Sequence, residues 1–204
     1  MKTDVYEFKK NEKNISTVIA AAGRIAKYNE LTAKQELRLT LLSEELVEML
    51  PNMLKYGSGK FWIENKGSDY DIHFVVEPDS MLPSEERERI LSVSRTGENA
   101  AAVGIMNKIR IAAEVMLANY ALTAGTAGNV YPDMPYSFYD MGLYTDPVGY
   151  SNAWSLSNYR DEVKDKNEAW DELEKSIIAN MADDVIVGII GGKVEITVKI
   201  SFDK

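Results

Sequence analysis

The clearest pattern of hydrophobic and polar positions lies at the end of the chain, in residues 185–202. From 194 to 202 every second residue is apolar, and the residues between them are charged or hydroxylic. This period of two predicts a β-strand with one buried face and one wet face. An apolar run at 185–190 precedes it, and the Gly-Gly pair at 191–192 suits a two-residue turn, so these stretches predict an antiparallel hairpin.

Helical spacing of apolar residues marks three segments, at about 14–29, 32–50 and 97–118. The second begins with a capping box, in which the Thr32 hydroxyl accepts from one free backbone amide and the Gln35 side chain reaches back to another. Something apolar must cover the buried face of the hairpin. We therefore expect these helices to pack on one face of a sheet.

Further strands and a further helix are predicted by the same reasoning. Residues 60–65 and 70–77 predict a second hairpin, and residues 4–8 predict a short first strand. A charged helix is predicted at about 156–181, as an addition to the core fold. Its inward-facing residues should be Tyr159, Val163, Trp170, Leu173, Ile177 and Met181.

Together these elements predict an α+β fold, a two-layer α/β sandwich with a mixed, mostly antiparallel sheet covered by helices. With 204 residues, of which 45% are hydrophobic, the chain is long enough for one substantial core and too short to require two. We expect a single domain over residues 1–204.

Charge and composition exclude several classes of function. A net charge of −9 disfavours nucleic acid and anionic membranes as partners. The absence of cysteine excludes disulfides, thiol nucleophiles and thiolate metal sites.

The only histidine, His73, lies mid-strand on the face opposite Ile72 and Phe74, which favours a surface position over a general base. With no signal-like or membrane-spanning apolar run, we expect a cytoplasmic protein.

Residues 119–150 differ in composition from the rest of the chain. This segment holds six of the 11 tyrosines and three of the six prolines but no Lys or Arg. So many aromatic residues argue for an ordered, irregular excursion rather than disorder. Two roles remain open, a lid or contact surface for a protein partner and simple packing of the tyrosines onto the body of the domain.

The order of the elements, together with the helix around Glu45, resembles the ATP-binding domain of the GHKL superfamily, and most closely the anti-sigma-factor branch of histidine-kinase-like ATPases. The resemblance implies a Bergerat-type ATP-binding fold. In that family a Glu on the second helix orients the nucleophile, and an Asn one turn later holds Mg²⁺. Glu45 takes the place of that Glu, but Met49 then replaces the Asn, and a thioether does not bind Mg²⁺. Glu48 and Asn52 provide the same spacing with Pro51 inside it.

The resemblance also implies positions for the nucleotide. Asp79 matches the Asp that binds the adenine amino group, although the glycines that accompany it in the family are missing here. The phosphate loop corresponds to Gly97 to Gly104, with Arg95 and Lys108 as cations near a helix N-terminus. These residues form the expected cofactor site for ATP with Mg²⁺, in which Asn52 would be the metal ligand.

Two functions are compatible with these motifs, and a third alternative is that only the fold is shared and residues 119–150 form a pocket for an unrelated ligand. The first is a bacterial, histidine-kinase-like regulatory protein that has weak or lost nucleotide binding and acts as a binding module. The second is an active ATP-dependent serine/threonine protein kinase of the anti-sigma type. Because phosphoryl transfer needs a metal between the phosphates, Met49 and Pro51 favour the first.

Overall fold

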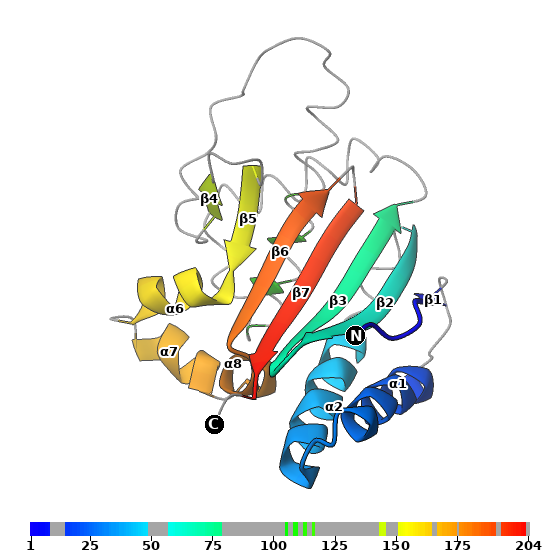
Figure 1. The fold of residues 1–204 in the computed structure, drawn as a ribbon. Coiled ribbons are helices and arrows are strands. Elements are labelled where there is room, and N and C mark those ends of the chain that lie inside the picture. The colour runs from blue at the N-terminus through cyan, green and yellow to red at the C-terminus, as the bar shows by residue number, and fades with distance from the viewer. Residues whose placement is uncertain are drawn as a thin grey trace.

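The computed structural model describes residues 1–8, 15–48, 57–78, 105, 108, 109, 112, 113, 116, 143–145, 151–164, 167–174, 176–190 and 193–202. Figure 1 shows the arrangement of the elements along the chain. They are β1 (Tyr6–Phe8), α1 (Ile15–Tyr28), α2 (Ala33–Glu48), β2 (Gly57–Lys66), β3 (Asp69–Pro78), β4 (Leu143–Thr145), β5 (Ser151–Ser155), α6 (Leu156–Val163), α7 (Asn167–Glu174), α8 (Ile177–Met181), β6 (Asp184–Ile190) and β7 (Lys193–Ser201).

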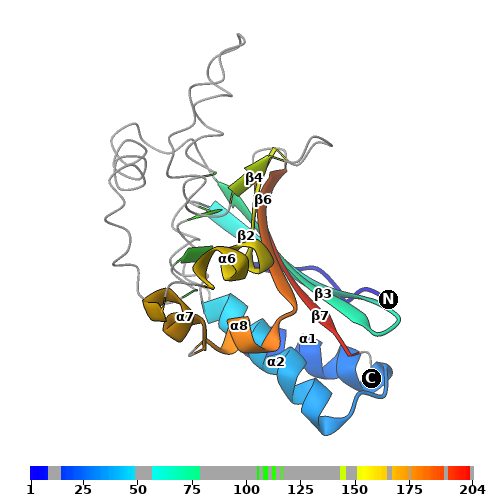
Figure 2. The same cartoon turned by 90° about the vertical axis from the view of Figure 1, so that its left-hand side faces the viewer.

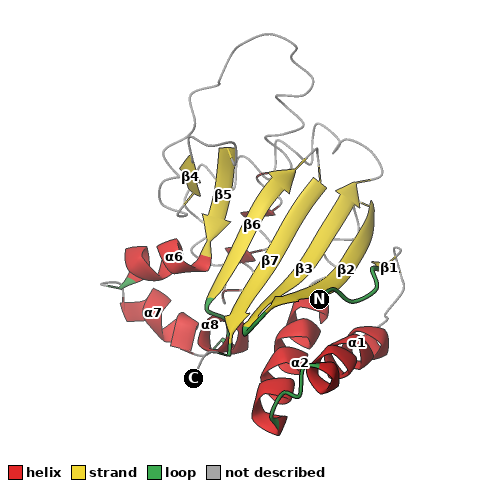
Figure 3. Cartoon of the chain, in the orientation of Figure 1, coloured by secondary structure: helices red, strands yellow, loops and turns green. Residues whose placement is uncertain are grey.

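The strands form one seven-stranded sheet in the order β1-β2-β3-β7-β6-β5-β4. The two predicted hairpins, β2–β3 and β6–β7, are confirmed, and they join because β3 pairs with β7. Every pairing among the described strands is antiparallel, whereas the sequence predicted a mixed, mostly antiparallel sheet. Figure 3 shows the strands side by side, with the described helices beside and below them.

The faces of the sheet follow the predicted alternation. In β7 the residues Val194, Ile196, Val198 and Ile200 are buried, and the residues between them are partly exposed. β3 repeats this pattern, with Phe74 buried and Val75 on the opposite face. One face of the sheet therefore contributes to the core, and we call the opposite side the open face.

All described helices lie on the core side of the sheet (Figure 2). α1 packs against α2 and β2, α6 packs against β5 and β6, and α8 packs against α2. The predicted helix at 97–118 is described only at 105, 108, 109, 112, 113 and 116, where the backbone is helical. Of these residues, all but Lys108 are buried. The α+β class with helices over one face is confirmed for the described part of the chain.

The capping box of α2 forms as predicted. The Thr32 backbone N–H donates to Gln35 Oε1 at 2.9 Å, and the Gln35 backbone N–H donates to Thr32 Oγ1 at 3.4 Å. This reciprocal pair fixes the start of the helix because it satisfies two amides that lack intrahelical partners.

The single helix predicted at 156–181 is wrong, because the segment folds as α6, α7 and α8. Serine side chains begin two of these helices: Ser155 Oγ accepts from Asn158 N at 3.1 Å, and Ser176 Oγ accepts from Ala179 N at 3.3 Å. Such local bonds compete with helix continuation. The breaks also change the helix face, so that Trp170 is 36% exposed and Ile177 is 42% exposed, against the prediction that both face inward.

The sequence prediction also missed two strands. β4 lies inside the segment 119–150 that was predicted to be irregular, and β5 follows it directly. β5 pairs with β6 through Trp154 and Ser155, and Trp154 is buried in the core. Strands of three and five residues give too short an alternation to be recognised in a sequence. The rest of 119–150, including its expected role in partner binding, lies outside the described residues.

The two faces of the sheet should respond differently to truncation. We expect Phe74→Ala to lower the free energy of unfolding by about 3–5 kcal/mol, because it opens a cavity in the core. The neighbouring substitution Val75→Ala, on the open face, should cost about 1 kcal/mol or less. Chemical denaturation of both variants measures the difference, and equal losses would contradict the assignment of faces.

Candidate functional site

The structure describes three of the eight residues that the sequence predicted for the nucleotide site. Glu45 and Glu48 lie in the last turn of α2, and Lys108 is one of the six described residues between 105 and 116, all of which have a helical backbone. The other five predicted residues lie outside the described residues, and they are Asn52, Asp79, Arg95, Gly97 and Gly104. The described part of the predicted site is therefore the end of α2 and the surroundings of Lys108.

The last turns of α2 concentrate negative charge. Glu44, Glu45 and Glu48 lie there, and no basic residue does. Residues three and four apart are neighbours on a helix surface, so Glu48 is close to both other carboxylates. The partial negative charge of the helix C-terminus adds to their repulsion. We call these three residues the acidic turn. Their mutual repulsion lowers the stability of the isolated helix.

Glu45 has the most unfavourable environment in the acidic turn. Partial burial raises the pKa of its carboxyl group, and the charges of Glu48 and Glu44 raise it further. A carboxyl group in such a position either keeps a proton to higher pH or gains from a bound cation. No ion pair within the described residues supplies that cation to Glu45.

Lys108 is not joined to the acidic turn by any hydrogen bond or ion pair among the described residues. Its ammonium lies 5.1 Å from the centroid of the Tyr159 ring, on α6. Among the described residues there is also no cluster of three or more Asp, Glu or His side chains that could hold a metal ion. The expected grouping of acids and Lys108 around one nucleotide is thus not assembled by the described part alone.

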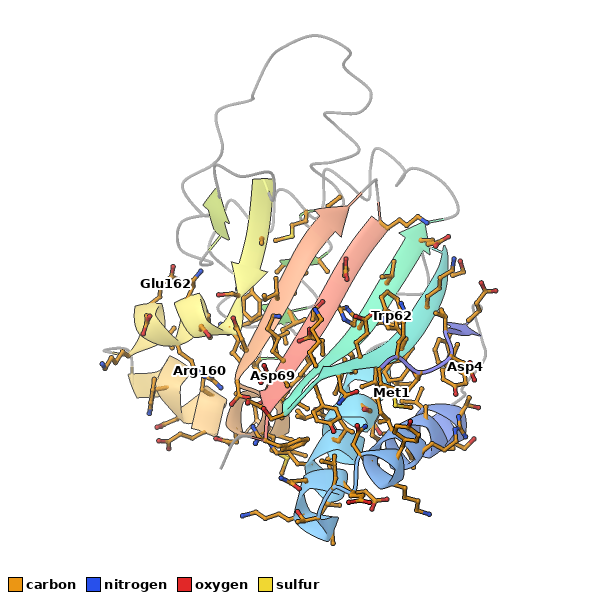
Figure 4. All side chains as sticks on the ribbon, in the orientation of Figure 1. Met1, Asp4, Trp62, Asp69, Arg160 and Glu162 are labelled. Carbon is orange, nitrogen blue, oxygen red and sulfur yellow. The ribbon has the colours of Figure 1, made fainter. Side chains whose placement is uncertain are left out.

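A second group of side chains lies on the open face, where Figure 4 shows Trp62 standing on the sheet. The rings of Trp62 and His73 stack with centroids 4.8 Å apart and planes 10° from parallel. His73 Nδ1 lies 3.2 Å from Glu195 Oε1 and 3.2 Å from Thr197 Oγ1. The prediction that His73 faces away from the core is confirmed, but its side chain is only 14% exposed because of these neighbours.

The chemistry of His73 is limited by its other nitrogen. A His–carboxylate pair is the orienting half of many general bases, and in them the second ring nitrogen exchanges the proton. Here Nε2 is buried and has no hydrogen-bond partner within the described residues. A substrate cannot reach a nitrogen in that position without displacing the stack. The arrangement therefore favours a structural role.

Several other charges of the open face are paired. Lys2 binds Glu64 at 3.0 Å and lies 4.4 Å over the Trp62 ring, and Lys199 lies 3.4 Å from Asp71. Lys193 and Lys60 both bind Glu77, at 2.8 and 3.0 Å, and together they lower the pKa of that carboxyl group.

The sequence analysis did not identify this surface, although the period of two in 60–64 was a usable signal. The open face contrasts with the acidic turn, where no described cation is bound to the carboxylates.

Comparisons with known proteins add no family to this picture. No protein-family model matches the chain, and no curated protein matches its sequence. Among the described residues, no helix is both long and apolar enough to cross a membrane.

We expect Glu45→Gln to stabilise the protein at pH 7 by roughly a few tenths of a kcal/mol, because the side chain is only partly buried and solvent screens the repulsion. The raised pKa fixes the pH dependence. Between its ordinary value of 4.5 and the folded value, the native state holds more protons than the unfolded chain, so wild type loses stability as pH rises. Glu45→Gln removes this pH-dependent loss of stability. The difference in the free energy of unfolding between the variant and wild type should therefore disappear below about pH 4.5.

The matched control is Glu36→Gln, in the first turn of the same helix. A carboxylate there is favoured by the helix dipole, so its removal should destabilise the protein. Denaturation curves at several pH values measure both variants. A destabilising Glu45→Gln at pH 7 would show that the carboxylate has a favourable partner in the native protein.

We expect Trp62 and His73 to be coupled by about 0.5–1.5 kcal/mol, the range for stacked aromatic pairs. A double-mutant cycle with Trp62→Ala and His73→Ala measures this coupling in the free energy of unfolding. Strictly additive losses would mean that the stack contributes nothing beyond separate burial.

Proposed function

We propose that this protein is a binding module and that the acidic turn of α2 faces its ligand. The observation that carries the proposal is the position of Glu44, Glu45 and Glu48 in the last turns of α2, where no basic residue lies. Burial and the two neighbouring glutamates raise the pKa of Glu45, in agreement with this arrangement. A helix selected only for stability would have Lys or Arg in its last turn. Local arrangements that lower stability are expected where a protein binds something. A cation or a cation-carrying ligand is the chemistry that relieves this repulsion.

In its finer form, the proposal is a histidine-kinase-like regulatory protein with weak nucleotide binding. An acidic turn repels the phosphates of free ATP, so ATP should bind only together with Mg²⁺. By the resemblance, Glu45 would correspond to the family's Glu, whereas Met49 offers no oxygen to the metal. This combination supports binding without phosphoryl transfer. A protein partner at residues 119–150 would fit a regulatory module and belongs to the same proposal.

An active serine/threonine kinase of the anti-sigma type is the alternative. It would use Glu48 or Glu45 with Asn52 as the metal ligand. Pro51 between Glu48 and Asn52 counts against it, because proline interrupts the one-turn relation that the two side chains need. Magnesium-dependent ATP turnover that Glu45→Ala or Asn52→Ala abolishes would establish this alternative.

Calorimetric titration of the full chain with ATP, with and without Mg²⁺, tests the proposal. We expect binding only with Mg²⁺, at a dissociation constant of about 1 mM or somewhat below, which corresponds to about −4 kcal/mol. Glu45→Gln should weaken binding roughly threefold or more, since it removes one charge that attracts the metal. Glu36→Gln, at the other end of the helix, should bind as wild type does.

The outcomes separate the parts of the proposal. If titration with ATP and Mg²⁺ gives no heat of binding, the protein does not bind the nucleotide, and that part of the proposal is wrong. Binding that Glu45→Gln leaves unchanged would contradict the role of the acidic turn. A parallel assay of ATP hydrolysis should stay at background, because no residue in the place of the family's Asn can hold Mg²⁺.

A further inference from the structure

Tyr159 on α6 has a buried hydroxyl group without a partner among the described residues. The residue is only 5% exposed, and its hydroxyl makes no hydrogen bond within the described structure. Its ring packs near Trp154 of β5, with centroids 6.0 Å apart. Buried polar groups are nearly always hydrogen-bonded. A buried hydroxyl without a protein partner is therefore expected to bind a ligand or a water molecule.

Lys108 brings a positive charge to the same place from a distant part of the sequence. Its ammonium lies 5.1 Å from the centroid of the Tyr159 ring, and the side chain is partly buried. The chain has 32 acidic residues, yet among the described ones none forms an ion pair with Lys108. The attraction of the ring for the ammonium explains its position but uses none of its three N–H donors.

We propose that Lys108 and Tyr159 form a binding site for an oxyanion, a phosphate or a carboxylate group. Such a group has several acceptor oxygens, so it can accept from the ammonium and from the hydroxyl at once. Bonds between a charged donor and an ionised oxygen are stronger than neutral ones, and partial burial reduces their screening by water. One ligand would thus satisfy a hydroxyl and neutralise a charge that have no hydrogen-bond or ion-pair partner among the described residues.

The family resemblance implies a place for Lys108 beside the phosphates of a nucleotide, but this site contains no residue of the acidic turn, and a simple anion can bind it whether or not the protein binds a nucleotide. The two sites attract opposite charges, so one ligand group does not suit both. A water molecule on the Tyr159 hydroxyl is the competing explanation. It would satisfy the hydroxyl but leave the lysine charge uncompensated, which is why the anion is favoured here.

The test is a thermal-unfolding titration of the full chain with inorganic phosphate and, separately, with acetate, against sodium chloride at the same ionic strength and without Mg²⁺. We expect at least one of the two anions to raise Tm in a saturable way. The anion with the larger rise identifies the phosphate or the carboxylate class. Omitting Mg²⁺ and ATP keeps this result independent of the acidic turn.

The decisive variant is Tyr159→Phe, which removes only the hydroxyl. Because that hydroxyl has no partner within the described structure, Tm of the free protein should stay the same or rise. Affinity for the anion should fall about tenfold. Lys108→Gln should reduce affinity by about the same factor or more. The buried Tyr70, which packs against Phe202, is the control, and Tyr70→Phe should keep the anion response.

Each other outcome overturns the proposal. If neither anion raises Tm, or if Tyr159→Phe shows the full rise, the Tyr159 hydroxyl does not bind the anion. A water molecule is then its partner. A marked fall of Tm in anion-free Tyr159→Phe would mean that the hydroxyl already has a partner in the free protein. If Lys108→Gln fails to fold, the isosteric Tyr159→Phe still decides.

Discussion

The pairing of β3 with β7 is the constraint on which the rest of the structure depends. β2–β3 and β6–β7 are local hairpins, and neither alone can bury its apolar face. The pairing brings Phe74 opposite Ile196 and joins the two hairpins into the centre of one sheet. It closes a loop of more than a hundred residues, whose entropic cost must be offset by the core that it creates. A shift of this register by one residue would exchange the two faces.

Two arginines join α2 and α6 to the end of α8 and to the residues that connect it to the sheet. Arg38 of α2 donates from Nε to Met181 O at 2.6 Å, and Arg160 of α6 donates to Asp183 O at 3.0 Å. Carbonyls at a helix C-terminus lack intrahelical donors, so these cations satisfy them and interact favourably with the helix dipole. Since β6 begins at Asp184, the same bonds fix where the chain leaves the helices and enters the sheet.

Charge is distributed unevenly over the molecule. On the open face, cross-strand neighbours of opposite sign offset one another, as in Lys199 with Asp71. The acidic turn at the end of α2 has no such compensation among the described residues, although lysine there would be more stable. At Lys108 the imbalance has the opposite sign. These two places, rather than the aromatic stack on the open face, are where a bound ligand would gain the most electrostatic free energy.

Much of the fold could be predicted from the sequence because it depends on neighbours in the chain. The alternation in 194–202, the hairpins and the capping box at Thr32 each involve residues a few positions apart, and each is confirmed. Local signals failed where tertiary contacts decide. β5, for example, is stabilised by its pairing with β6, which lies about thirty residues further along the chain.

The candidate sites divide in the same way. The sequence by itself places Glu45 and Lys108 on helices, because their spacing in the chain is local information. Only the tertiary structure shows that Glu45 is partly desolvated and that Lys108 lies over Tyr159. Burial, the stacking of His73 on Trp62 and the isolation of a buried hydroxyl depend on residues far apart in sequence. The pattern of neighbouring residues in a sequence does not determine such distances, because the packing of the whole chain sets them.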